Sequence, residues 1–222
     1  LLFKPFNIVC EITDFNNKKI VDYLFSKNKE LGLITDYGKV HRLDKDTTGL
    51  LLWAKTEEGL EYLRELFKSR NIEKKYLAIV YGKVPSNSFS IDVPLKRDSN
   101  RPTVSASLDG KNSLSIFTVK EEIANNLNLI EINIHSGRMH QIRAHLRLLN
   151  LSILFDNKYG KIKTINEFKR QFNILDFDYS ILKEQLCLIS QELKFNYFNE
   201  EFNFRINQSK NFESILSLPY SH

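Results

Sequence analysis

The sequence predicts an α+β fold built on a largely antiparallel or mixed sheet. Three observations lead to this prediction. Several short apolar runs have the length of strands, a few segments show helical periodicity, and no regular strand–helix alternation connects them. No change in composition and no low-complexity linker marks a boundary, so we expect one domain over residues 1–222.

The individual elements follow from local patterns. Strands are predicted where apolar and β-branched residues form short runs, and helices where apolar residues recur every three or four positions. In the helix over 57–68, Leu60, Leu63 and Phe67 share one face and Thr56 is a suitable N-cap. In chain order we expect strands over 7–13, 49–54, 75–81, 114–121 and 127–134, helices over 57–68, 139–149 and near 165–172, strands near 185–190 and 192–197, and a short helix around 211–217.

Bulk properties restrict the class of protein only loosely. Lys and Arg exceed Asp and Glu by 32 to 27, and the resulting charge of +5 permits a polyanionic partner without requiring one. No apolar run approaches the roughly 18 residues of a membrane span, so no membrane association is expected. Cys10 and Cys187 lie far apart in the sequence and could pair in space, but two thiols in a chain of this size favour a reduced, cytosolic protein, and no metal-binding spacing involves them.

The first chemically informative segment is KVHRLDKDTTGLLLWAKT, residues 39–56. A cluster of charges that includes His41, Arg42 and Asp44 leads directly into an apolar strand. A loop before a rigid strand is a good platform for functional side chains. The alternative is a solvated turn with ion pairs, and the pattern alone leaves both interpretations open.

The second segment, INIHSGRMHQIRAHLRLLN, combines an apolar strand with an amphipathic, basic helix. Arg143 flanks the buried face of this helix, where it can reach inward to a carboxylate. His140, Arg143 and Arg147 have the spacing of one helical stripe, which suits a phosphate-binding surface. A solvated basic helix whose arginine stems cover apolar surface is the alternative.

Other cofactor chemistries lack their sequence signatures. His140 and His145 are five residues apart, whereas a zinc-binding helix needs histidines four apart on one face. No Walker loop, dinucleotide-binding glycine fingerprint or nucleophile elbow is present. We therefore expect no metal and no cofactor. In a third segment, EKKYLAIVYGKV, Tyr76 starts a strand and faces either a cleft or the core.

These three segments, in this order, resemble the RluA-type pseudouridine synthases. The family's His-Arg-Leu-Asp motif is matched by HRLDKDTTGLLL, its Lys-x-Tyr-x-Ala strand by KKYLAIVYG, and its Gly-Arg-Thr-His-Gln-Ile-Arg helix by GRMHQIRAHL. FDNKYG at 155–160 and the Lys4–Pro5 pair match weaker family elements. The RsuA-type group is less similar, because it has Gly before Arg-Leu-Asp.

The resemblance implies a bent, mixed sheet with helices and loops around a central cleft, and isomerisation of uridine in structured ribosomal or transfer RNA without a cofactor. It implies that Asp44 is the catalytic carboxylate, that Arg143 pairs with it, that Tyr76 packs on the target base, and that Arg42 helps to extrude the uridine. The residues expected to act in catalysis are Asp44, Tyr76 and Arg143, and those expected to bind RNA are Arg42, His41, Arg138, His140, Gln141 and Lys4.

Some positions depart from the family pattern. Phe3 stands where the family usually has Asn, Met139 replaces Thr or Ser, LNLSILFD lacks a His-Pro pair, and LCLISQELKF lacks a histidine. These departures leave the three catalytic positions intact and put the choice of RNA in doubt.

The resemblance leaves open alternative functions and whether a targeting segment or another module precedes these residues. The competing hypothesis is a catalytically silent relative that binds or chaperones RNA, and a weaker one is another base-modifying enzyme with an Asp–Arg pair. We expect a monomer in the bacterial cytosol. Because the chain does not begin with Met, organelle targeting or an upstream RNA-binding module stays open.

Overall fold

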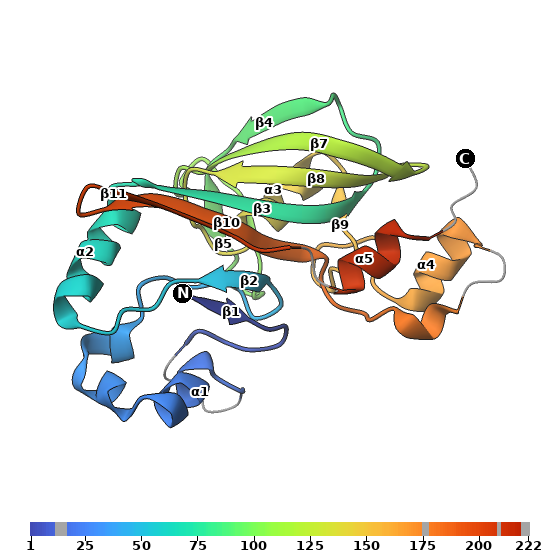
Figure 1. Ribbon diagram of the computed structural model, residues 1–222. Helices are drawn as coiled ribbons and strands as arrows, with labels where there is room; N and C mark the ends of the chain where they lie inside the picture. The colour runs from blue at the N-terminus through green and yellow to red at the C-terminus, as the bar shows by residue number, and fades with distance from the viewer. Residues whose placement is uncertain (12–16, 175–177, 208–209, 219–222) are drawn as a thin grey trace. The chain divides into compact units, whose positions relative to one another are not determined.

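The computed structural model describes residues 1–11, 17–174, 178–207 and 210–218. The chain forms two compact units. Their helices and strands are labelled in Figure 1. Unit 1 contains Leu1–Lys74 and Ser190–Ile206, and unit 2 contains Lys75–Ile189 and Asn207–His222. The chain therefore leaves unit 1 once and returns to it before its final segment.

Unit 1 has a small sheet with helices around it. Its strands are β1 (Leu2–Lys4), β2 (Thr48–Leu51), β10 (Leu188–Tyr197, which starts in unit 2) and β11 (Glu200–Arg205), in the order β1-β2-β10-β11. Its helices are α1 (Ile20–Lys27), the 3-10 turns η1 (Lys29–Leu33) and η2 (Thr35–Gly38), and α2 (Glu57–Lys68). Gly49, with φ 116°, allows β2 to approach β10 closely, because a Cβ there would lie 2.3 Å from the carbonyl oxygen of Ser190.

Helix α2 starts and ends where its sequence indicates. The hydroxyl of Thr56 accepts a hydrogen bond from the amide of Gly59 at 3.1 Å, acidic residues occupy the first turn, and Lys68 lies in the last turn. One face packs on a buried cluster from the sheet, which consists of Leu50, Leu52, Ile72, Leu193 and Phe195. Burial of this face, rather than helix propensity, supplies most of the helix's stability.

Unit 2 is built around a long antiparallel sheet (Figure 1). Strands β3 (Ile72–Tyr81, which starts in unit 1), β8 (Leu127–Ile134), β7 (Leu114–Ala124) and β4 (Ser88–Asp92) follow one another in the order β3-β8-β7-β4, and β9 (Ser152–Ile153) also pairs with β3. A separate ribbon joins β5 (Leu95–Arg97) to β6 (Val104–Ala106). The helical elements are α3 (Gln141–Leu148), α4 (Ile165–Phe172), the 3-10 turn η3 (Tyr179–Ile181) and α5 (Lys210–Leu216).

The sequence located most of the long elements. The helix over 57–68 and the strand over 127–134 are confirmed to the residue, and α3, α4, α5, β3 and β7 lie at or within three residues of their expected bounds. The predominance of antiparallel pairing confirms the α+β prediction. Strand β2 is shorter than expected, because Trp53 makes only an isolated bridge with Lys39.

Two strand predictions are wrong. Positions 7–11 form no strand, since Val9 makes only an isolated parallel bridge with Lys19, and positions 12 and 13 lie outside the described residues. The two strands near 185–190 and 192–197 are one strand, β10. The polar residues Gln191 and Glu192 interrupt the apolar pattern but are buried within β10, so the strand continues through them.

Candidate active site

Asp44 lies in the loop between η2 and β2 of unit 1. Its side chain is half-buried, and its carbonyl oxygen accepts a hydrogen bond from the amide of Thr47 at 3.1 Å, which closes the turn before β2. Leu43, just before it, is buried, and its amide donates to the sulfur of Cys10 at 3.5 Å. The backbone on both sides of Asp44 is thus tied to its surroundings.

Lys4 holds the same loop from inside the unit. Its side chain is fully buried, and its ammonium donates to the carbonyl oxygens of Pro5 at 3.0 Å, Ile8 at 2.8 Å and Lys45 at 3.0 Å. Desolvation lowers the pKa of Lys4 to about 8, although nearby acidic groups, including Asp44, act in the opposite direction. These contacts give Lys4 a structural role in the loop, and its contact with RNA stays a prediction.

The side chains of His41 and Arg42 lie in different surroundings. The Nε2 atom of His41 accepts a hydrogen bond from the amide of Leu52 at 2.9 Å, and the ring stacks on Phe67 with centroids 4.3 Å apart. Desolvation, and secondarily the charge of Lys74, lowers the pKa of His41 to about 3, so the ring is neutral near pH 7. Arg42 is exposed and forms an ion pair with Glu11. Of the two, Arg42 has the exposure that an RNA contact requires.

In unit 2, Arg143 forms a buried two-pronged ion pair with Asp156. Nε donates to Oδ2 at 2.8 Å and Nη2 donates to Oδ1 at 2.7 Å, and both side chains are almost completely excluded from solvent. Desolvation would raise the pKa of Asp156. The hydrogen bonds and charge of Arg143, with the amides of Tyr159 and Lys158, outweigh it and leave that pKa below its usual value.

The position of Arg143 on its helix predicts that it reaches inward to a carboxylate, but the sequence does not single out Asp156 as that carboxylate. Asp156 lies in the FDNKYG segment, where its side chain also accepts from the amides of Lys158 and Tyr159 at 2.9 and 3.0 Å. The family-like Asp-x-x-Tyr spacing of that segment was the available signal. The pairing of Arg143 with Asp44 stays a prediction, because Asp44 belongs to unit 1 and Arg143 to unit 2.

The expected basic stripe on α3 is wrong. His140 precedes the helix in a left-handed conformation with φ 51°, and its buried ring contacts the hydroxyl of Tyr159 at 3.1 Å through Nδ1. Arg143 is buried and Arg147 is exposed, so the three side chains do not share a solvent-facing surface. The stripe fails because helical geometry begins only at Gln141.

The other predicted residues of this segment are held by hydrogen bonds. Gln141 is buried: its Oε1 accepts from the hydroxyl of Ser136 at 2.7 Å and from the amide of Arg138 at 3.1 Å. Its Nε2 donates to the carbonyl oxygen of Leu114 at 3.0 Å. Arg138 itself is half-exposed, and its Nε donates to the carbonyl oxygen of Asn112 at 3.3 Å. Gln141 thus fixes the backbone that presents Arg138.

Tyr76 is a buried residue of β3, paired with Ile132 of β8. The sequence left open whether it faces the core or a cleft. It belongs to unit 2 together with Arg143, while Asp44 belongs to unit 1.

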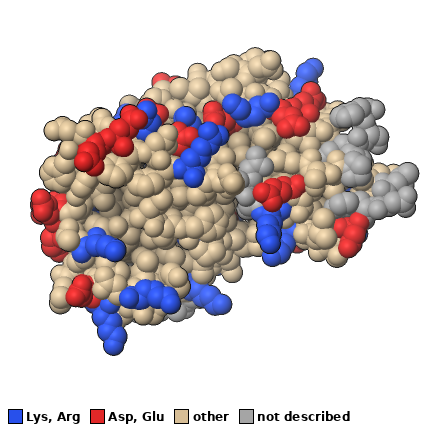
Figure 2. Space-filling view, viewed as in Figure 1, with Lys and Arg blue, Asp and Glu red and all other residues tan. Residues whose placement is uncertain are grey.

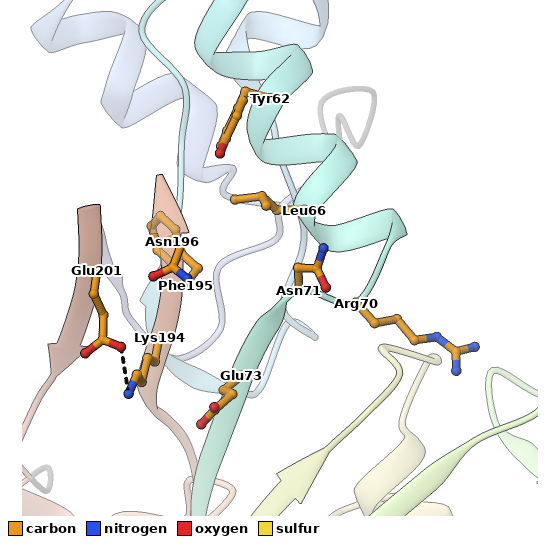
Figure 3. A pocket seen from close by; sticks show the side chains of 9 residues that line it. All are labelled: Tyr62, Leu66, Arg70, Asn71, Glu73, Lys194, Phe195, Asn196 and Glu201. Carbon is orange, nitrogen blue, oxygen red and sulfur yellow. Dashed lines mark ion pairs between the residues drawn. The ribbon is translucent and has the colours of Figure 1, made fainter. Parts of the chain in front are cut away.

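A hollow of about 550 Å³ in unit 1 is separate from the predicted site (Figure 3). The charged residues that line it include two basic ones, Arg70 and Lys194, and two acidic ones, Glu73 and Glu201, so their charges cancel. Lys194 forms an ion pair with Glu201 at 3.0 Å. None of the residues predicted for the site lines it. On the face shown in Figure 2, basic and acidic side chains are likewise spread together.

In the described part of the chain, no group of three or more His, Cys, Asp or Glu side chains could hold a metal ion. Within the same residues, no helix is both long enough and apolar enough to cross a membrane.

Comparisons of the sequence with known proteins point to one family. The family model described as RNA pseudouridylate synthase matches residues 1–148. A ribosomal large subunit pseudouridine synthase C of Buchnera aphidicola is 43% identical over 139 residues, which cover 61% of this chain and 44% of the relative. An uncharacterised RNA pseudouridine synthase of Bacillus subtilis is 37% identical over 146 residues, covering 64% and 48%. The chain spans about half the length of these curated relatives.

Comparisons of the structure support the fold. Human RNA pseudouridylate synthase domain containing 4 aligns with a TM-score of 0.72 and 23% identity, covering 96% of this chain and 87% of the human one. Human RNA pseudouridylate synthase domain containing 1 aligns with a TM-score of 0.61 and 19% identity, covering 82% and 81%. At these identities the likeness concerns the fold alone.

Proposed function

Because this chain belongs to the RNA pseudouridylate synthase family, we propose that it isomerises uridine to pseudouridine in structured RNA, with Asp44 as the catalytic carboxylate. The observation that carries the proposal is the Asp44 loop itself. Lys4 and Cys10 bind its backbone at Lys45 and Leu43, and the His41 side chain ties the loop to the amide of Leu52, while Asp44 stays half-exposed. A functional carboxylate on a rigid platform requires this combination.

The reaction needs no external energy and no co-substrate. The bond between C1′ of the ribose and N1 of the base breaks, the base turns, and a bond between C1′ and C5 forms. The proton on C5 leaves and N1 takes up a proton, so the composition of the RNA is unchanged. An ionised, partly desolvated carboxylate suits attack on the sugar, attack on the base, or removal of a sugar proton.

We propose supporting roles for the other predicted residues. Tyr76 packs on the target base, and Arg42, which is exposed beside the Asp44 loop, helps to occupy the space of the extruded uridine. Arg143 acts on Asp44, with Asp156 fixing the orientation of its guanidinium group. Arg138 contacts the RNA backbone, held in place through Gln141.

Ribosomal RNA is the first substrate to test, because a relative that is 43% identical is named a ribosomal large subunit pseudouridine synthase. Transfer RNA is the second. We further propose that the protein acts as a monomer in the bacterial cytosol, which size-exclusion chromatography with light scattering and cell fractionation would check.

Release of tritium tests the proposal directly. In transcribed ribosomal RNA labelled with tritium at C5 of uridine, the wild-type protein should release label, and Asp44→Asn and Asp44→Ala should abolish the release. Asp22→Asn, which changes an exposed carboxylate on α1, is the matched control and should release label as the wild type does.

Other outcomes identify the alternatives. Unchanged release by both Asp44 variants would remove Asp44 from the chemistry. Tight, salt-sensitive RNA binding without release from any RNA would favour a silent RNA-binding relative. A product nucleoside that differs in mass from uridine would indicate another base-modifying reaction.

A further inference from the structure

A left-handed turn precedes the Asp44 loop. Asp36, Tyr37 and Gly38 are consecutive residues with positive φ angles of 49°, 53° and 81°. Residues other than glycine in this region cost of the order of 1–3 kcal/mol each and persist only when their surroundings hold them. The turn leads directly into residues 39–44, so whatever holds it also sets the direction in which the loop begins.

Arg64 of α2 binds this turn at two points. Its Nε and Nη2 donate to the carbonyl oxygen of Lys39 at 3.1 and 2.7 Å, and Nη2 also donates to Oδ2 of Asp36 at 2.6 Å. A planar guanidinium can span a carbonyl and a carboxylate in this way, whereas an ammonium presents a single point of charge. Arg64 therefore joins the start of the turn to the residue that follows it.

Two residues that follow β2, Trp53 and Ala54, also bind the turn through hydrogen bonds. The indole nitrogen of Trp53 donates to the carbonyl oxygen of Tyr37 at 2.5 Å, and the amide of Ala54 donates to the carbonyl oxygen of Gly38 at 2.9 Å. Only glycine fits at position 38, because a Cβ there would lie 2.2 Å from the carbonyl oxygen of Ala54. The turn is thus held between α2 and the residues that follow β2.

The same side of α2 supports the next part of the loop. Phe67, three residues after Arg64 and therefore on the same side of the helix, stacks on His41. His41 in turn accepts the amide hydrogen of Leu52. Helix α2 thus contacts the backbone at Lys39 and the side chain at His41, and Asp44 follows three residues later.

We propose that Arg64 is a positioning residue that sets the approach of the Asp44 loop. This inference rests on the proposed role of Asp44. The ion pair of Arg64 with Asp36 is partly exposed, with side-chain exposures of 35% and 54%, so it contributes little to overall stability. Loss of Arg64 should therefore lower catalysis more than it lowers stability.

Kinetics of three variants test this role. With the tritium-labelled ribosomal RNA, Arg64→Ala and Arg64→Gln should lower kcat roughly ten- to a hundredfold, the expected effect of misplacing a catalytic group by about 1 Å. KM should change by less than about threefold. Arg64→Lys keeps the charge opposite Asp36 but cannot span both acceptors, so its kcat should be intermediate. Arg70→Ala, an exposed arginine just after α2, is the matched control and should retain wild-type kcat.

Hydrogen exchange tests the same role without activity. In Arg64→Ala, amide exchange should rise in peptides covering 36–47 and stay unchanged in peptides covering 127–134 of unit 2. If the wild type releases no tritium, the proposed function fails, and the exchange result alone decides whether Arg64 holds the loop. Unchanged exchange over 36–47, a raised KM with unchanged kcat, or a kcat loss explained by global unfolding would each overturn the inference.

Discussion

Burial decides what the ionisable side chains of this protein can do. Lys4 and the Arg143–Asp156 pair are almost completely excluded from solvent, and their charges are met by carbonyl oxygens or by each other. Breaking a buried pair by removing one partner typically costs about 3–5 kcal/mol. These residues therefore fix geometry, whereas Arg42 and Arg138 have the exposure needed to meet RNA.

The stability of the protein should depend on the protonation of His41 in acid. The pKa of His41 is lowered to about 3, against about 6.5 in an unfolded chain. Between these values the unfolded state binds more protons, so the free energy of unfolding should fall as the pH drops from about 6.5 toward 3. His41→Gln, which can accept the amide hydrogen of Leu52 without titrating, should lose less stability over this range.

Urea unfolding at pH 7 and pH 4.5 would measure this difference. His145, whose pKa is also lowered by desolvation, titrates in both proteins and cancels in the comparison. Equal losses of stability in the wild type and His41→Gln would show that His41 does not bear the acid sensitivity.

At the scale of elements, α2 combines two tasks. Its apolar side chains, Phe67 among them, pack on the buried cluster of unit 1, while Arg64 and Phe67 also hold the turn and loop before Asp44. The chain before α2 runs directly from β2 through Trp53 and Ala54, which hold the same turn. Correct placement of one helix is therefore a condition for the geometry of the loop.

The N-cap of α2 should contribute to stability and leave catalysis unchanged. Thr56→Ala removes the acceptor for the amide of Gly59 and should lower the free energy of unfolding by about 1 kcal/mol, and Thr56→Ser should restore most of it. Arg64 lies two turns further along the helix, so kcat should be unchanged. Urea unfolding and tritium release would measure the two effects, and a stability loss below about 0.3 kcal/mol would argue against the cap.

At the scale of the whole molecule, unit 1 is assembled from two distant parts of the sequence. Its buried cluster joins Leu50, Leu52 and Ile72 from the first part to Leu193 and Phe195 from β10. Neither part can bury its apolar side chains without the other.

Truncation at the start of the second part should therefore unfold unit 1. A fragment of residues 1–189 lacks Leu193 and Phe195, and its single tryptophan, the buried Trp53 of unit 1, should emit at the long wavelength of the urea-unfolded chain. A fragment of residues 1–207 keeps both parts and should retain the emission of the intact protein. Native-like Trp53 emission from the 1–189 fragment would contradict this account of the core.

The sequence predicted the features whose signals lie within a short stretch of residues and missed those that depend on contacts between distant residues. Periodicity and capping located α2, and the motif around Asp44 located the loop, because these signals lie within short stretches. The partners Asp156 and Arg64 were missed, since each contact joins residues 13 or more positions apart. The Asp-x-x-Tyr spacing of the FDNKYG segment singles out Asp156 but not the residue with which it pairs, and no local pattern indicates the contacts of Arg64. The prediction of two strands in place of β10 has a similar cause. Gln191 and Glu192 are buried by segments that are distant in the sequence, which the local pattern does not indicate.

The division of unit 1 between two parts of the chain also orders events during synthesis. Residues 1–74 leave the ribosome before residues 75–206 but remain without Leu193 and Phe195 until residues 190–206 have been translated. Residues 75–189 contain the paired strands β3, β8, β7 and β4, so the sheet of unit 2 can form while the nascent chain is still growing. The platform of Asp44 is therefore completed only after residues 190–206 have been translated, so the carboxylate proposed for catalysis is not held in its final place before then.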